Sequence, residues 1–139
     1  MASQRPHPTT ERPLAAPLLT FDVATLVAQL KGEEAWRTGA RNAMTLHQGP
    51  GLRIVLIAMH ANTTIPSHHA DGPISVQLLE GSITFRAAAH VVTLHTGQLL
   101  TLSAGILHVV EAEEESAFLL TMGGEVPFPR GSASAAGDA

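Results

Sequence analysis

The sequence has 139 residues, of which 45% are hydrophobic and 14% are charged, and its formal net charge is −4. This length suits one domain with a sizeable core, and the apolar content is too high for a disordered chain. The sequence contains no cysteine, which excludes disulfides, thiolate metal sites and cysteine nucleophiles. The eight Lys and Arg residues form no basic stripe, so we expect no nucleic-acid partner.

Hydropathy also argues against a membrane partner. The longest uninterrupted apolar run, from Ile54 to Met59, is far shorter than the roughly 20 residues that cross a bilayer. The N-terminal segment places Arg5 and Arg12 among prolines and lacks the continuous apolar segment and cleavage site of a secretory signal. We therefore expect a cytoplasmic protein.

The chain divides into an arm, one domain and a tail. Residues 1–19 are rich in proline, which disfavours helix and sheet, so we expect an extended arm that is disordered or laid on a partner. Residues 20–128 are expected to form the single domain. Residues 129–139 are mostly Ser, Ala and Gly, have little to bury, and are expected to form a disordered tail.

A short helix is predicted over residues 20–31. Thr20 or Asp22 can cap its start, apolar residues recur at helical spacing along it, and Gly32 can end it. The apolar stripe is too small to form a core alone. We expect it to pack on the outside of the domain or against a second subunit, with Trp36 as an anchor.

From residue 43 onward, short β-rich runs separated by turn residues at intervals of about ten are typical of a sandwich or barrel. Gly-rich breaks and Asn62 supply the backbone conformations that tight turns require. The acidic stretch from Glu111 to Glu115 is expected to be a solvated hairpin tip. Nine strands are predicted, at residues 43–47, 52–60, 63–66, 74–79, 82–88, 90–95, 98–102, 106–112 and 116–122.

Two blocks of sequence carry the candidate site. The first contains His68, thirteen residues before the Gly81 of a Leu-Glu-Gly turn, and the second ends in Gly105-Ile-Leu-His108. The blocks resemble the paired motifs of the cupin superfamily, over residues 50–122, and the whole chain resembles small bacterial single-domain cupins. This resemblance implies an all-β fold, a double-stranded β-helix or RmlC-like jelly-roll barrel with one short N-terminal α-helix. It also implies a homodimer.

The motifs depart from the family pattern at the metal site. A typical cupin holds a divalent metal with three histidines and a glutamate, and here only His68 and His108 occupy two of those four positions. Ala70 stands in place of the second histidine and Ile74 in place of the glutamate. His69 is one residue out of phase, so alternation sends it to the opposite strand face from His68 unless the backbone bulges.

Metal-bound and metal-free sites both stay open. Two imidazoles are fewer than the three protein ligands that usually hold a catalytic transition metal. His60, which ends a long apolar strand, or a bulged His69 would have to join His68 and His108, and the set would then suit Fe, Mn, Ni, Cu or Zn. Without metal, the pair would titrate near neutrality and serve as a general base or a hydrogen-bonding anchor.

The rest of the predicted pocket is aliphatic, which favours a small, weakly polar ligand. Gln77 is out of phase with its in-facing neighbours and is expected to point outward. Plain core filling is the alternative role for the predicted wall residues, which are Met59, Ile74, Val76, Leu78, Phe85, Leu107 and Val110.

Three functions from different classes follow, in order of preference. The first is a small-molecule-binding cupin, such as a sensor or accessory protein, with the reduced pocket of His68 and His108. The second is a divalent-metal-dependent enzyme, an oxygenase or isomerase, in which both histidines bind the metal. The third is a metal-free isomerase or epimerase, which needs a partnering acid that the sequence does not place in phase. A third in-facing ligand would separate the first two.

Overall fold

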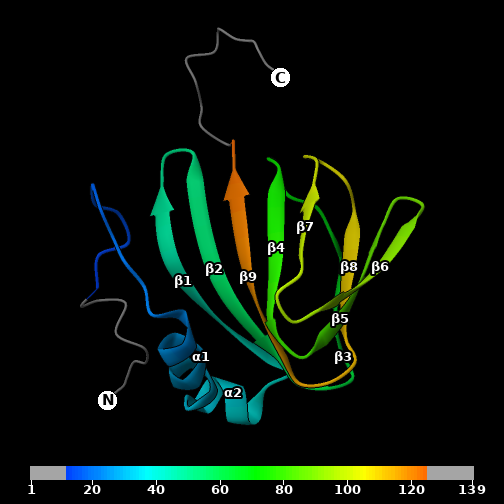
Figure 1. The fold of residues 1–139 in the computed structure, drawn as a ribbon, viewed down its shortest axis with the longest axis horizontal. Coiled ribbons are helices and arrows are strands. Elements are labelled where there is room, and N and C mark those ends of the chain that lie inside the picture. The colour runs from blue at the N-terminus through cyan, green and yellow to red at the C-terminus, as the bar shows by residue number, and fades with distance from the viewer. Residues whose placement is uncertain (1–11, 125–139) are drawn as a thin grey trace, which may run out of the picture.

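The protein is described by a computed structural model of residues 12–124, in which two antiparallel sheets face each other (Figure 1). One sheet has the strand order β1-β2-β9-β4-β7 and the other has the order β3-β8-β5-β6. The nine predicted strands are present, with ends shifted by at most two residues, and the jelly-roll prediction is confirmed. The strands are β1 (Arg41–Gly49), β2 (Leu52–Met59), β3 (Thr63–His68), β4 (Ile74–Glu80), β5 (Ser82–Ala87), β6 (His90–His95), β7 (Leu99–Leu102), β8 (His108–Ala112) and β9 (Ser116–Gly123).

The main core fills the space between the two sheets. On β4, Ile74, Val76 and Leu78 are buried and Gln77 is exposed, as the two-residue period of a strand requires. Each such apolar side chain contributes about 1.5–3 kcal/mol when it is fully buried. The buried members of this core are Met59, Ile74, Val76, Leu78, Ile83, Phe85, Ala87, Leu94, Val110, Ala112 and Phe118.

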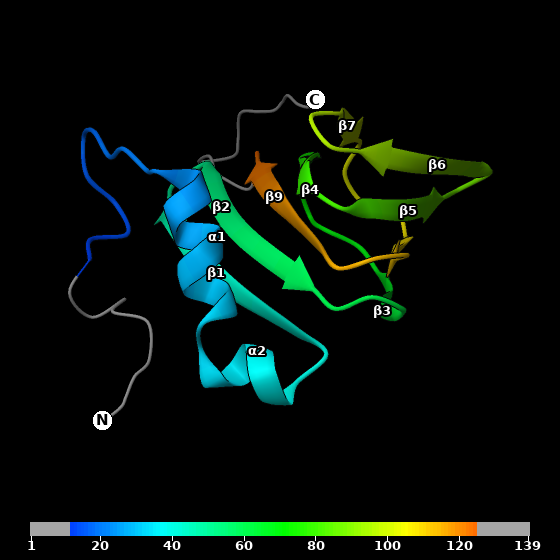
Figure 2. The ribbon, with the colours of Figure 1, turned by 60° about the horizontal axis from the view of Figure 1, so that its bottom comes forward.

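Two short helices lie against the outer face of the five-stranded sheet, beside β1 and β2 (Figure 2). Helix α1 (Val23–Lys31) begins after Asp22, whose carboxylate accepts a hydrogen bond from the backbone N–H of Thr25. The predicted helix is confirmed, although it starts at residue 23 rather than 20. A second helix, α2 (Glu34–Thr38), was not predicted because its five residues are too short to show a helical period.

A second core lies between the helices and this outer sheet face. Trp36 is buried there at 7% exposure, so the predicted anchor packs within its own chain. Neither helix among the described residues has the length and apolar character needed to cross a membrane. The buried members of this second core are Val27, Leu30, Trp36, Met44, Leu46, Leu56, Ala58 and Ala117.

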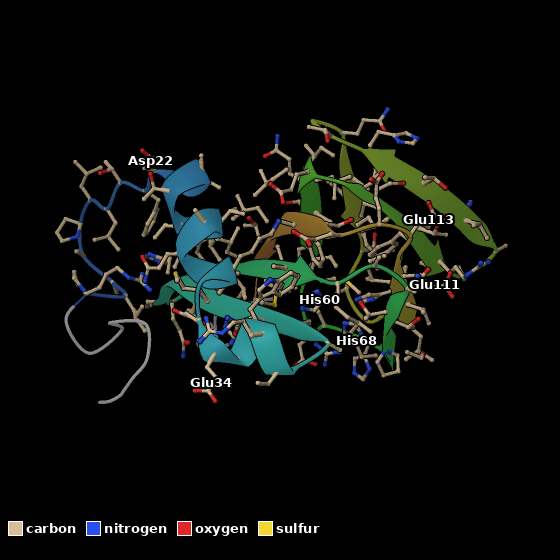
Figure 3. The ribbon with its side chains drawn as sticks, turned by 90° about the horizontal axis from the view of Figure 1, so that it is seen from below. Asp22, Glu34, His60, His68, Glu111 and Glu113 are labelled. Carbon is tan, nitrogen blue, oxygen red and sulfur yellow. The ribbon has the colours of Figure 1, made fainter. Side chains whose placement is uncertain are left out.

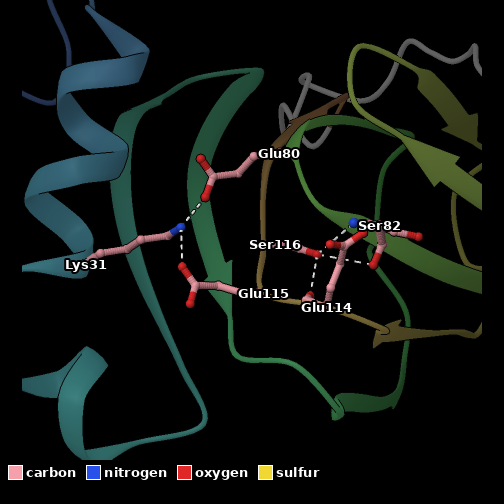
Figure 4. A network of polar contacts seen from close by, with 6 residues as sticks. All are labelled: Lys31, Glu80, Ser82, Glu114, Glu115 and Ser116. Atoms are coloured by element: carbon pink, nitrogen blue, oxygen red, sulfur yellow. Dashed lines mark hydrogen bonds and ion pairs between the residues drawn. The ribbon is translucent and has the colours of Figure 1, made fainter.

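The acidic hairpin between β8 and β9, which the sequence predicted only as a solvated tip, also contacts helix α1. Lys31 of α1 forms ion pairs with Glu80 and with Glu115, the latter at 2.7 Å, which tie the helix to the sheet (Figure 4). Burial lowers the pKa of Lys31, but hydrogen bonds and ion pairing with the two glutamates outweigh burial and leave it raised. Beside them, the backbone N–H of Ser82 donates to the Ser116 hydroxyl at 3.0 Å. The hairpin therefore links helix α1 to the five-stranded sheet in addition to being exposed to solvent.

Part of the predicted arm packs on the domain itself. The Arg12 guanidinium donates to the carbonyl of Thr45 at 2.9 Å, and the backbone N–H of Gln48 donates to the carbonyl of Leu14 at 2.8 Å. These contacts cover the outer edge of β1, whose backbone groups would otherwise lack partners. Arg12 and Leu14 of the predicted arm therefore contact the domain, and the division into an arm at 1–19, a domain at 20–128 and a tail at 129–139 stays a prediction. Residues 1–11 of the arm and the whole tail lie outside the described residues.

Candidate ligand-binding site

The site begins with two histidines on neighbouring strands. In β3, a register shift between Ile65 and His68 brings His68 directly opposite His108 of β8. Their ring centroids lie 4.1 Å apart, with the ring planes at 60°. The structure thus brings together the two histidines that the sequence motifs singled out.

Backbone carbonyls fix the tautomers of both rings. His68 Nδ1 lies 2.8 Å from the carbonyl oxygen of Pro66, and His108 Nδ1 lies 3.0 Å from that of Ile106. A carbonyl oxygen can only accept, so each Nδ1 carries the proton and donates it. In the neutral rings, each Nε2 therefore presents a lone pair. It can accept a hydrogen bond or bind a cation.

Burial separates the two histidines chemically. His108 is 4% exposed and stacks on Phe85 with 5.2 Å between ring centroids, whereas His68 is exposed. Burial lowers the pKa of His108 below its ordinary value, and the nearby His68 and His69 lower it further, against an opposing hydrogen bond to Ile106. His108 is consequently held in its neutral form at pH 7.

Both rings line a cavity of about 420 Å³ at the end of the barrel. Within residues 12–124, the only buried polar side-chain atom without a partner is Glu33 Oε2. His108 Nε2 also has no hydrogen-bond partner within these residues, yet it is not among the buried unpartnered atoms. It is therefore accessible, and because His108 lines the cavity, a ligand in the cavity can reach this atom. The lining residues are Gln48, Gly49, Leu52, Arg53, His68, His69, Ala70, Asp71, Gly72, Ile74, His108, Leu120, Met122 and Gly123.

His69 lies at this cavity although simple alternation sends it to the other face. It follows the last residue of β3, which is also the residue where the β3–β8 pairing resumes after its register shift. The chain turns out of the strand there, so the two-residue period no longer governs side-chain direction. Adjacent His68 and His69 can therefore line one cavity.

His60 lies elsewhere. Its ring stacks on Trp36 with 3.5 Å between centroids, and its Nε2 donates to the Trp36 carbonyl at 2.7 Å. Figure 3 shows His60 beyond the end of β2 and His68 at the end of β3. His60 is not among the cavity residues, so the structure removes it from the predicted ligand set.

The predicted aliphatic wall is mostly core. Of its members, only Ile74 lines the cavity with the histidines. Leu107 is 59% exposed, and the others, Met59, Val76, Leu78, Phe85 and Val110, fill the space between the sheets. The physical reason is close packing, because side chains from both sheets fill the middle of the barrel. The cavity lining is therefore mixed, with polar residues such as Arg53 and Asp71 beside apolar ones, and not the aliphatic wall that was expected.

The donors in position do not fit a family-type metal site. Within residues 12–124, no group of three or more His, Asp or Glu side chains is arranged to hold a metal ion. His68 and His108 alone give two imidazole ligands, one fewer than the usual minimum for a catalytic transition metal. The described side chains therefore do not supply the ligand set of a family-type metal centre.

Sequence reasoning missed three polar cavity residues, Gln48, Arg53 and Asp71. Arg53 could have been found, because it is in phase with Val55, Ile57 and Met59 along β2. That signal is weak, since every residue from 54 to 59 is apolar and the sequence does not show which face is inside. Asp71 lies in a turn, where side-chain direction follows from no period.

Comparison with solved structures identifies the fold. A cupin 2 conserved barrel domain protein from Leptotrichia buccalis matches with a TM-score of 0.60 and 25% identity, covering 63% of this chain and 42% of that one. A conserved protein of unknown function from Streptococcus pyogenes matches with a TM-score of 0.57 and 25% identity, covering 60% and 73%. An RmlC-like cupin from Shewanella frigidimarina matches with a TM-score of 0.58 and 14% identity, covering 61% and 77%.

The comparisons of the sequence with protein families and with curated proteins found no significant match. The structural matches therefore bear on the fold, and the activity must be argued from the site.

Proposed function

Because the chain belongs to the cupin superfamily, we propose that it binds a small molecule in the cavity around His68 and His108. One observation carries the proposal: both histidines donate through Nδ1 to backbone carbonyls, which leaves each Nε2 free for a ligand. The pair lines a cavity of about 420 Å³, a size typical of small-molecule sites.

The surroundings suit binding. Phe85 stacks on His108, and the β3–β8 pairing holds the two rings together, so their geometry is set before a ligand arrives. A preorganised site loses less side-chain entropy on binding. His108, buried and neutral, serves as the hydrogen-bond acceptor, and the more exposed His68 adds a second acceptor near the cavity entrance.

The proposal is tested with a thermal-shift screen of sugars, amino acids, organic acids and aromatic alcohols, followed by calorimetric titration of the compounds that raise the Tm. The variants are His68→Asn and His108→Asn, and the control is His95→Asn, an exposed histidine outside this cavity. We expect a compound that binds wild type and the control equally and both site variants about tenfold more weakly. A screen in which no binding depends on either site histidine would refute the proposal.

The competing hypothesis is a divalent-metal-dependent enzyme, an oxygenase or isomerase, with His68 and His108 as ligands. Elemental analysis of tag-free protein separates the two. The proposal expects no stoichiometric transition metal in wild type. Stoichiometric Fe, Mn, Ni, Cu or Zn that is lost in both His68→Asn and His108→Asn would favour the enzyme.

The expected homodimer and cytoplasmic location remain predictions. The apolar residues Val91 and Leu99 are 60% and 58% exposed, and they lie on the outermost strands β6 and β7 of the two sheets. A second subunit could cover them. Light scattering coupled to size exclusion would give the mass in solution.

A further inference from the structure

An arginine lies on the cavity face of the five-stranded sheet. Arg53 of β2 is directly opposite Met122 of β9, and Met122 is directly opposite Ile74 of β4. Residues opposite one another in antiparallel strands point to the same face of the sheet. Ile74 belongs to the inter-sheet core and lines the cavity, so Arg53 is on the cavity side as well.

Arg53 has no protein partner among residues 12–124. The ion pairs of that part of the chain involve Lys31 and Arg86, while Arg12 and Arg37 donate to backbone carbonyls. Asp71 also lines the cavity, but it is not within ion-pair distance of Arg53. A guanidinium presents five donors in a planar fork, which matches the geometry of a carboxylate or a phosphate.

The cavity residues His68, His108 and Asp71 favour a different ligand group, a hydrogen-bond donor. His68 and His108 offer Nε2 lone pairs, which accept hydrogen bonds, and Asp71 offers carboxylate oxygens, which also accept. A ligand complementary to the whole cavity therefore carries an anion at one end and O–H donors at the other.

We propose that the ligand is a small hydroxycarboxylate, with its carboxylate on Arg53 and a hydroxyl donating to Nε2 of His108 or His68. The inference rests on the proposed function and names its ligand class. It assigns Arg53 as the residue that selects acids over neutral analogues, with Gln48, which is opposite Arg53 on β1, beside it at the cavity wall.

The test compares three acids, glycerate, tartrate and gluconate, with their neutral amides, which keep the hydroxyls and lose the charge. Dissociation constants are measured by NMR titration at low salt for wild type, Arg53→Gln and the control Arg86→Gln. Arg86 lies on the other sheet and pairs with Glu111, outside the cavity. We expect at least one acid to bind wild type about tenfold more tightly than its amide. Arg53→Gln should remove that difference, and Arg86→Gln should keep it.

Other outcomes overturn the inference in distinguishable ways. If the amides bind as tightly as the acids and His108→Asn weakens both, Arg53 is not an anion site but the histidine pocket stands. If an acid is preferred equally by wild type and Arg53→Gln, its carboxylate binds elsewhere. If no acid binds, the hydroxycarboxylate class is excluded, and the broader screen decides the proposed function separately.

Discussion

Replacing Gly81 with alanine should destabilise the protein by about 2–5 kcal/mol, from strain and overlap together. Gly81 has a φ of +88°, and a Cβ there would lie 2.2 Å from Ser116 Oγ and 2.4 Å from the carbonyl oxygen of Glu115. The left-handed conformation costs an L-residue about 1–2 kcal/mol. Overpacking adds about 1–3 kcal/mol, because Ser116 is fully buried and hydrogen-bonded to Ser82 and cannot swing away.

Urea unfolding followed by tryptophan fluorescence measures this change, because the single tryptophan, Trp36, is buried in the folded state. Gly97→Ala is the matched control. Gly97 has a φ of +89°, but nothing lies within 4 Å of the position of its Cβ, so the substitution introduces strain without overlap. The control should cost about 1–2 kcal/mol. Equal losses in the two variants would refute the packing argument.

Two further predictions concern His108 and Ala88. Burial lowers the pKa of His108 in the folded state below its ordinary value of 6.5. At a pH between the folded-state pKa and 6.5, the unfolded chain therefore binds more protons than the folded chain. Its contribution to stability is therefore complete above pH 6.5 and falls as the pH drops toward the folded-state value. Unfolding of wild type and His108→Asn at pH 5.5 and 8 should show a smaller pH dependence in the variant, and an unchanged one would contradict the assignment. Ala88, between β5 and β6, has a φ of 53°, a left-handed conformation that costs an L-residue about 1–2 kcal/mol. Because Asn tolerates this region better, Ala88→Asn should recover part of that cost, and a loss of stability measured by urea unfolding would argue against strain there.

The order and approximate limits of the elements follow from local rules. The alternation of Ile74, Val76 and Leu78 around an outward Gln77 set the pleat of β4, and Asp22 and Gly32 marked the ends of α1. Asn62 has the expected left-handed φ of 65°. Ala88 has the same conformation but carries no sequence signal, because alanine gives no preference for a left-handed turn.

Some residues of the candidate site could be identified from sequence motifs, whereas the positions of others depended on tertiary packing. His68 and His108 could be paired because the two motifs that contain them resemble the paired motifs of the cupin superfamily. The direction of His69 could not, since it depends on where the β3–β8 pairing shifts and where β3 ends. The position of His60, which could point either way from the end of its strand, could not be predicted. Its stacking partner, Trp36, lies on a helix far from it in sequence, and only packing brings the two rings together.

The sequence by itself determined the succession of nine strands along the chain, because periodicity and turn residues act over short stretches. The jelly-roll barrel and the two central histidines followed from the resemblance of two short motifs to those of the cupin superfamily. The tertiary structure alone decided what surrounds them. Arg53, Asp71 and Gln48 come from three separate segments, and whether they line a cavity depends on which sheet face is inside and on where the strands end. No local sequence pattern places these three residues together, so the polar character of the cavity, on which the proposed ligand class rests, was visible only in the fold.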